Sequence, residues 1–496
     1  MRLVYAWFFP ANPAGDEAYY WDWGRRLDYG YFSKPPFIAW LYAFVDWAGQ
    51  STVFGIRATA AVLGALTLLV VFRLATELFD SETGFAVTLI ALATPANSAV
   101  SFLLTIDAPL MFFWASALLL TWRYADNRTP VLSLSLLCLA LGLGHLTKQM
   151  MMVFPVLAIL FLALGKETRG VLVRPGWWIA TLGSYLFLAP PLIWNARNEW
   201  ITFQHTTHHF ASGSQGGNFF VERAADFGEY LATQAMVLSP VIAVVIACLT
   251  LSGLTRLRRS SRQVRFLLVF SAIPLAFMLL LALRQKMLPN WPAVFYIAAS
   301  ILAAAWFCRK IDLPAPPVSW RKSLRPGLAI GFSLVFLFYA GPVVFPLIGK
   351  PGYYLDFNRR LLGHDKLGAG FDEIRSQVPG GEEDFIVALN HRDLASHLAF
   401  HLEGQPRVYR YTARGIESQY EMWPNPVEDG LTGRNALILH ASTRLPAPLR
   451  DAFRQIEVAG EFEVEYRFDR TRRFFVLRGI DLQSWPPLAL PDPEHP

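Results

Sequence analysis

The sequence predicts a polytopic α-helical membrane protein with about 11 transmembrane helices and a C-terminal soluble α/β domain. Of its 496 residues, 54% are hydrophobic and only 17% are charged, whereas soluble domains carry about 25% charged residues. Apolar runs long enough to cross a hydrocarbon core of about 30 Å recur as far as residue 350. Beyond them, the pattern changes to short strand-like segments.

The predicted transmembrane domain covers residues 1–350. Its first span is short, because only MRLVYAWFFP precedes a polar stretch, about half of what a spanning helix needs. No cleavage-like site for a signal peptide follows, so we expect the true start to lie upstream. Clear later spans are VFGIRATAAVLGALTLLVVFRLA (53–75), PLMFFWASALLLTW (109–122), VLSLSLLCLALGLGHL (131–146), MMVFPVLAILFLALG (151–165), WWIATLGSYLFLAPPLIW (177–194) and GFSLVFLFYAGPVVFPLIG (331–349).

Charge is distributed unevenly between the loops. The loop 255–265 has five arginines and no acid, and 308–326 has five basic residues and one acid. The loops 122–129 and 165–175 are also net basic. Our count of the spans puts all four on one side, which the positive-inside rule makes cytoplasmic. The loops 12–50 and 195–230 and the tail 351–496 are then expected to face outward.

The tail 351–496 is predicted to fold as an α/β domain. Its strand candidates alternate or cluster apolar residues, and one segment, LASHLAFHL (394–402), has helical spacing. The strand candidates are FIVALN (385–390), RVYRY (407–411), NALILHA (435–441), EFEVEYRF (461–468) and RRFFVLRG (472–479). Earlier in the chain, ITFQHTTHHFASGSQGGNFF (201–220) is too polar to span, and its Gly-rich centre predicts a mobile outward loop.

Ionisable side chains gather at the outward ends of several spans. Asp16 and Glu17 follow the short first span, Asp107 begins another, and Lys34 and Lys148 lie at comparable positions. An N-cap or a solvated acid pair would explain Asp16 and Glu17, and snorkelling would explain one lysine. Charges beside lipid are costly unless they are paired or functional. Several of them at one membrane face therefore indicate a site.

This combination of residues suits a lipid-linked phosphosugar. Lysines at the interface can hold a phosphate and stabilise the charge that grows as it leaves. A nearby carboxylate can remove the proton from an attacking hydroxyl. The aromatic residues Tyr19, Tyr20, Trp21 and Trp23 suit either sugar stacking or a membrane-interface belt.

Five motifs before residue 350 and a segment of the tail carry a family resemblance. DEAYYWDWGRRLDYGYFSKPPFIAWL (16–41) resembles the first outward loop of bacterial C-type membrane glycosyltransferases, which are relatives of protein O-mannosyltransferases and of the lipid A aminoarabinose transferase. TIDAPLMFFW (105–114), HLTKQ (145–149), PLIWNARNEWITFQHTTHH (191–209) and LPNWPAVFY (288–296) are similar to later motifs of that family, in the same order. In the tail, NHRDLASHLAFHLEGQPRVYRY and SQYEMW resemble a segment of its dolichyl-phosphate-mannose-type members.

The resemblance implies transfer of a sugar from a polyprenyl-phosphate donor at the periplasmic face of the bacterial inner membrane. Lipid A, lipopolysaccharide, another glycolipid and a protein all stay open as acceptors, and so does the sugar. The implied catalytic residues are Asp16, Glu17 and Asp107, with Asp16 as the base or acceptor-orienting group. The implied donor-phosphate ligands are Tyr31, Lys34, Lys148 and His205, and the implied sugar or acceptor contacts are Tyr19, Tyr20, Asn290 and Trp291.

Two positions depart from the family pattern. Gln204 stands where Arg is usual, and Ser33 replaces an acid that some relatives have before Lys-Pro-Pro. A metal site built on that acid should be absent, and we expect no cofactor. The pair His208 and His209 would be the alternative metal ligands, but neither Cys nor acid accompanies them at ligand spacing.

Other function classes stay open beside the transferase. A lipid-sugar flippase or other transporter would also have many spans, although the span centres are nearly uncharged and no matching halves are visible. A membrane anchor for the outward domain would leave the Asp-Glu loop unexplained. Arg392 and Asp393 we interpret as helix packing, and Arg25, Arg26 and Arg57 as possible cations for a charged sugar. The three cysteines lie in or beside apolar runs, so no disulfide framework is expected.

Overall fold

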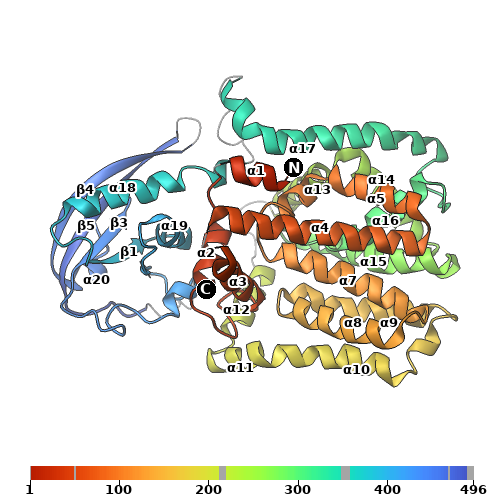
Figure 1. Ribbon diagram of the computed structural model, residues 1–496, viewed down its shortest axis with the longest axis horizontal. Helices are drawn as coiled ribbons and strands as arrows, with labels where there is room; N and C mark the ends of the chain where they lie inside the picture. Colours follow the sequence, from red (N-terminus) through yellow and green to blue (C-terminus); the bar gives the residue numbers. More distant parts are fainter. Residues whose placement is uncertain are drawn as a thin grey trace. The chain divides into compact units, whose positions relative to one another are not determined.

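The computed structural model describes residues 2–9, 11–49, 52–211, 219–347, 358–466 and 470–488. The chain divides into two compact units (Figure 1). We call Met1–Leu3, Lys34–Phe37 and Ile56–Tyr339 the helical unit, and Val4–Ser33, Ile38–Gly55 and Ala340–Pro496 the mixed unit. The domain boundary expected at residues 350 and 351 lies outside the described residues.

The helical unit consists of α-helices joined by short 3-10 turns. Its elements are α4 (Val53–Leu78), α5 (Ser81–Leu92), α6 (Pro95–Val100), α7 (Asp107–Ala125), α8 (Pro130–His145), η1 (Gln149–Met152), α9 (Val153–Leu164), η2 (Arg169–Val171), α10 (Pro175–Gly183), η3 (Ser184–Leu188), α11 (Ala189–Arg197), α12 (Ile201–Ala211), α13 (Phe219–Leu238), α14 (Pro240–Leu254), η4 (Leu257–Arg259), α15 (Arg262–Arg284), α16 (Phe295–Phe307), η5 (Val318–Ser323) and α17 (Leu324–Leu347).

Several of these helices are apolar and long enough to cross a membrane. Among the described residues there are four such helical stretches, Val53–Leu78, Pro175–Arg197, Arg262–Arg284 and Val318–Phe345. A fifth is formed if Val221–Leu238 and Pro240–Leu254 are taken together, although they are bent by 110°. Pro240, which has no backbone N–H, begins the second half of that bent pair. Shorter apolar helices occur as well, so the expected number of about 11 spans stays a prediction.

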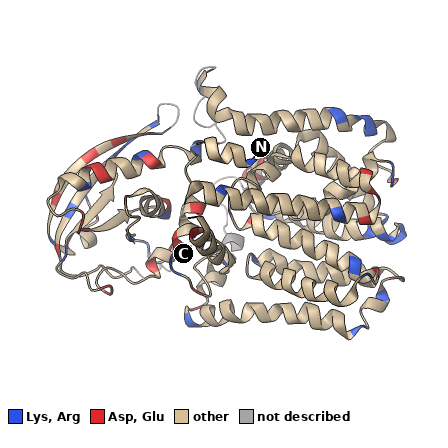
Figure 2. Ribbon diagram, in the orientation of Figure 1, with Lys and Arg blue, Asp and Glu red and all other residues tan. Residues whose placement is uncertain are grey.

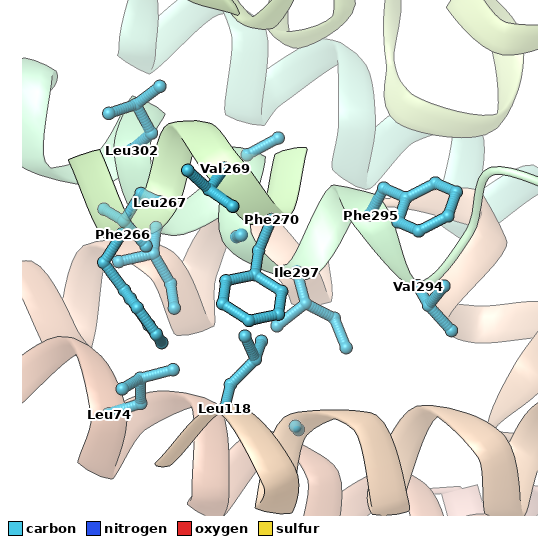
Figure 3. Close-up of a cluster of buried hydrophobic side chains, with 14 of the residues drawn as sticks. Leu74, Leu118, Phe266, Leu267, Val269, Phe270, Val294, Phe295, Ile297 and Leu302 are labelled. Carbon is cyan, nitrogen blue, oxygen red and sulfur yellow. The ribbon is translucent and has the colours of Figure 1, made fainter. Parts of the chain in front are cut away.

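The core of the helical unit is built from large apolar side chains of α4, α7, α15 and α16. Leu74, Leu118, Phe266 and Phe270 are among those drawn in Figure 3, and all four are fully buried. Close packing sets the helix separation, because a Cβ on Gly253 would come within 2.2 Å of Leu268. Close contacts of this kind stabilise the helical unit through dispersion.

The four basic loops lie at one end of the helical unit. Two arginines of the loop 255–265 pair with acids of two other loops. Arg262 pairs with Asp126 of 122–129 at 3.0 Å, and Arg265 pairs with Glu167 of 165–175. In the fourth loop, Lys310 pairs with Asp80, just after α4 ends. The same end of α4 carries Glu77, which pairs with Arg123 of the loop 122–129. Figure 2 shows Lys and Arg gathered at helix ends while the helix centres are nearly free of charge. The loops therefore share one side, as the sequence predicts.

The mixed unit combines N-terminal helices with the C-terminal sheet. Its strands form one sheet in the order β2-β1-β3-β5-β4, in which β1 is parallel to β2 and β3, while β5 is antiparallel to β3 and β4. Its elements are α1 (Arg2–Phe8), α2 (Gly15–Gly24), α3 (Phe37–Gly49), η7 (Arg359–Leu361), α18 (His364–Gln377), β1 (Phe385–Leu389), α19 (Arg392–His401), β2 (Val408–Tyr411), η8 (Gln419–Glu421), β3 (Ala436–His440), α20 (Ala447–Arg450), β4 (Phe453–Tyr466) and β5 (Arg470–Leu482).

The predicted strands and the predicted helix of the tail are all present. The strands β4 and β5 are longer than expected, because each pairs with the other almost along its whole length. Helix α18 was not predicted, since Gly368 and Gly370 weaken its helical pattern. Those glycines are required by close contacts instead: a Cβ on Gly368 would meet His401, and one on Gly370 would meet Phe462.

The expected loop 195–230 is mostly helical where it is described. Helix α12 occupies Ile201–Ala211, and α13 begins at Phe219. The interpretation of 201–220 as a loop is therefore wrong over α12. The start of α12 is supported by a hydrogen bond from outside the helix: the side-chain oxygen of Asn195 accepts the N–H of Thr202 at 3.2 Å. The Gly-rich centre of this segment and the side chains of His208 and His209 are not among the parts of the chain that the structure describes.

Candidate active site

The two acids of the first motif take different positions in the first turn of α2. Glu17 is fully buried, and its Oε2 accepts the backbone N–H of Ala14 at 2.8 Å. The side chain of Asp16 is 48% exposed, and Arg392 donates a hydrogen bond to its Oδ1 at 2.8 Å. Both carboxylates suit the positive end of a helix. Glu17 therefore caps the helix, whereas Asp16 is accessible.

The rest of α2 is bonded to C-terminal residues of the mixed unit. The hydroxyl of Tyr19 accepts the N–H of Gln419 at 2.6 Å, and Tyr420 donates to Asp22 at 2.8 Å. The side chain of Gln419 also accepts the N–H of Phe32 at 2.7 Å. Sequence reasoning assigned none of these C-terminal residues to the site, although the SQYEMW resemblance pointed to this segment.

The predicted tyrosines of this motif are packed inside the mixed unit. Tyr19, Tyr20 and Tyr31 are buried, and burial raises the pKa of Tyr19 to about 12. Tyr31 stacks on Trp23 with ring centroids 4.4 Å apart. Its hydroxyl donates to the carbonyl of Arg26 at 3.0 Å, and burial raises its pKa. These contacts support packing roles, and the sugar and phosphate roles stay predictions.

A second polar cluster lies at the start of α7 in the helical unit. Lys148 Nζ donates to Asp107 Oδ1 at 2.8 Å, and Asn290 Nδ2 donates to Asp107 Oδ2 at 2.6 Å. We call these three residues the Asp107 cluster. Both carboxylate oxygens are engaged, and Lys148 and Asp107 are largely buried. A buried ion pair persists only with good geometry and further hydrogen bonds, which Asn290 supplies.

The Lys34 motif runs beside this cluster. Phe37, three residues after Lys34, donates its N–H to the carbonyl of Leu146 at 3.0 Å, just before Lys148. The ring of Phe37 also meets Phe113 of α7 edge-on at 5.2 Å. The Lys-Pro-Pro, Asp-Ala-Pro and His-Leu-Thr-Lys motifs are thus neighbours at one end of the helical unit. Asp107 begins α7 and the basic loop 122–129 ends it, so the cluster and the basic loops are separated by the length of the helix, about 28 Å for 19 residues.

The remaining predicted residues are in the helical unit. His205 lies in α12, and Trp291 follows Asn290 before α16; both side chains are partly buried, as is Lys34. Their proposed phosphate and sugar contacts stay predictions. Among the described residues, no group of three or more His, Cys, Asp or Glu is arranged to hold a metal ion.

The chain is similar to known sugar transferases. Residues 33–194 match the family described as dolichyl-phosphate-mannose-protein mannosyltransferase. The lipid A galacturonosyltransferase RgtD of Rhizobium johnstonii is 29% identical over 423 residues, which cover 82% of this chain and 81% of that protein. The undecaprenyl phosphate-alpha-4-amino-4-deoxy-L-arabinose arabinosyl transferase of Pectobacterium atrosepticum is 27% identical over 298 residues, and the match spans 58% of this chain but only 51% of that protein.

Solved structures show a related fold. The crystal structure of ArnT from Cupriavidus metallidurans in the apo state matches with a TM-score of 0.63 and 17% identity, over 96% of this chain and 95% of that one. The structure of the same protein bound to undecaprenyl phosphate matches with a TM-score of 0.60, at 17% identity over 96% of each chain. The fold class is therefore that of ArnT: apolar helices followed by a small C-terminal sheet.

Proposed function

We propose that this chain, which is similar to dolichyl-phosphate-mannose-protein mannosyltransferases and to bacterial lipid A sugar transferases, transfers a sugar from a polyprenyl-phosphate donor to lipid A. A related lipopolysaccharide, another glycolipid or a protein is the alternative acceptor. The reaction takes place at the periplasmic face of the bacterial inner membrane, into which residues 1–350 insert with about 11 spans. Residues 351–496 form the periplasmic domain, and the four basic loops face the cytoplasm.

The Asp107 cluster is the observation that carries this proposal. An ammonium group has three N–H donors, and the Asp107 contact uses one donor of Lys148. The other two can bind phosphate oxygens, while Asp107 and Asn290 fix the direction of the side chain. The Lys-Pro-Pro segment alongside brings Lys34 to the same end of the helical unit. This arrangement suits a phosphate that must be held while negative charge grows on it.

In the proposed mechanism, Asp16 acts as the base. The acceptor oxygen attacks the anomeric carbon as the bond from that carbon to the phosphate oxygen breaks, and the proton passes to Asp16. The displacement is in line, so the anomeric configuration inverts. Polyprenyl phosphate leaves with the bonding electrons and is held by Lys34 and Lys148. Both oxygens of Asp107 already accept hydrogen bonds, from Lys148 and Asn290, so its role is to orient Lys148.

An assay of the purified full chain tests this function against a flippase. Proteoliposomes receive undecaprenyl phosphate carrying labelled galacturonic acid or 4-amino-4-deoxy-L-arabinose, together with lipid A. We expect release of undecaprenyl phosphate and transfer of label to lipid A with one of the two donors. Movement of the intact donor across the bilayer without cleavage would indicate a flippase and contradict the proposal.

Replacement of Lys148 tests the phosphate contact. Hydrogen bonds to charged groups contribute about 1.5–3 kcal/mol, so Lys148→Ala should lower kcat/KM for the donor about tenfold to a hundredfold. Lys310→Ala is the matched control, because Lys310 also pairs with an aspartate, Asp80, but at the opposite, basic end of the helical unit. Equal donor kinetics in the Lys148 variant and the control would contradict the assigned contact.

A further inference from the structure

The first turn of α2 fits closely against the first turn of α19. Arg392, the first residue of α19, donates to Asp16. A Cβ on Gly15 would come within 2.6 Å of Asp393 Cγ, so the two first turns are in close contact. Further along both helices, the ring of Trp21 meets Phe400 edge-on at 4.9 Å. The acidic helix is therefore built into the C-terminal part of the mixed unit.

The direction of Arg392 is fixed by an aromatic ring. Its guanidinium carbon lies over the ring of Tyr19, 4.6 Å from the centroid. Tyr19 is fully buried, accepts a hydrogen bond from Gln419 and stacks on Tyr420 with centroids 5.7 Å apart. A planar guanidinium on a fixed ring presents its donors in one direction. Arg392 thus approaches the Asp16 carboxylate from a set angle.

The Arg392–Asp16 pair contributes little to folding. The side chains are 26% and 48% exposed, and ion pairs of such exposure add little to stability. Helix α2 is in any case held by the Tyr19–Gln419 and Asp22–Tyr420 hydrogen bonds. The pair instead orients the Asp16 carboxylate. Arg392 binds its Oδ1, and Oδ2 can then receive a proton.

We propose that Arg392 is a positioning residue of the transfer reaction, which holds the Asp16 carboxylate in the orientation needed to remove the acceptor proton. This inference rests on the proposed function, in which Asp16 is the base. It also assigns the C-terminal part of the chain a role in the chemical step, because α19 supplies Arg392 and the 418–423 segment fixes the ring beneath it.

Kinetic measurements on Arg392 variants of the full chain test this inference. They use whichever of the two labelled donors supports transfer in the assay above. A misplaced catalytic group can cost about a hundredfold in rate, so we expect Arg392→Gln to lower kcat tenfold to a hundredfold while the donor KM changes less than threefold. Arg392→Lys should recover part of kcat, because it restores the charge without the planar group. Arg473→Gln, which breaks an exposed pair with Glu463 on β5 and β4, is the control and should match the wild type.

The melting temperature separates positioning from folding. We expect Arg392→Gln to melt within about 4 °C of the wild type, since the pair is partly exposed and α2 keeps its hydrogen bonds to Gln419 and Tyr420. Wild-type kcat in this variant, or a loss of activity that follows a large fall in melting temperature, would overturn the inference. Activity retained by Asp16→Asn would instead overturn the base assignment in the proposed function, so the two failures are distinguishable.

A cross-link gives a second, independent measurement. Gly15→Cys and Asp393→Cys, placed together in a variant whose three natural cysteines are replaced, put one thiol on each side of this close contact, where oxidation can join them. If α2 stays on α19 through the reaction, oxidation should leave the turnover of the reduced double variant unchanged. Loss of turnover on oxidation that a reductant reverses would overturn the fixed positioning of Asp16.

Discussion

At the scale of single residues, neighbouring acids have different environments. Glu17 is buried and bonded to the backbone at the start of α2, whereas Asp16 is accessible and meets Arg392. A buried carboxylate that caps its own helix cannot reach a substrate hydroxyl without breaking the cap. The accessible acid is therefore the better base, even though the pair is adjacent in sequence.

Amide substitutions distinguish the two acids. Asp16→Asn removes the group that takes the proton, so transfer should fall by at least a hundredfold, about the lower limit for general base catalysis. Glu17→Gln keeps a side-chain oxygen that can accept the Ala14 N–H and should retain transfer within a few-fold of the wild type. Donor turnover and membrane expression of each variant are the measurements. Equal loss of transfer in both variants would place the buried acid in the chemistry as well.

At the scale of secondary-structure elements, α18 and α19 share a stack of histidine rings. The rings of His364 and His397 are parallel, with centroids 3.5 Å apart, and His401 lies 6.0 Å from His397. Burial lowers the pKa of His364 and His401 to about 4 and that of His397 well below its ordinary value. Asp365 and Asp393 oppose this shift for His364, but burial outweighs them.

This stack predicts an acid-sensitive mixed unit. The folded histidines stay neutral while the unfolded ones bind protons below about pH 6.5. The stabilisation is complete above that pH and is lost as the pH falls from about 6.5 towards 4. Hydrogen exchange of the β1 and α19 amides should therefore quicken over this range. His397→Leu should flatten the dependence, whereas His440→Gln should not; an unchanged profile in His397→Leu would contradict the assignment.

At the scale of the whole molecule, charge divides the helical unit into two ends. The four basic loops are linked by ion pairs at one end, the fourth through the end of α4, and the Asp107 cluster begins α7 at the other end. If the basic end faces the cytoplasm, the cluster lies on the periplasmic side, where we propose that sugar transfer takes place.

Thiol labelling tests this orientation. Single cysteines at Arg258, in a basic loop, and at Glu382, in the mixed unit, are introduced after the three natural cysteines are replaced. A membrane-impermeant maleimide applied to cells with a permeable outer membrane should label Glu382→Cys and should reach Arg258→Cys only after lysis. The opposite labelling pattern would invert the proposed topology and remove the site from the periplasm.

The sequence by itself determined the class of the molecule and the motifs of the site. Apolar runs, basic loops and alternating strands are local patterns, and each is readable without knowing its neighbours. They predicted the helical unit, the shared side of the basic loops and strands β1, β2 and β3. The order of the motifs likewise singled out the acids and lysines for which we propose a catalytic or phosphate-binding role.

Only the tertiary structure decided which of these residues meet. Asp107 accepts hydrogen bonds from Lys148 and Asn290, which are 41 and 183 residues away in the sequence. Asp16 accepts one from Arg392, which is 376 residues away. No local pattern encodes such contacts, because they depend on how helices pack. For the same reason, Arg392 looks like ordinary packing in the sequence, and only burial shows that Glu17, unlike Asp16, is enclosed in the fold.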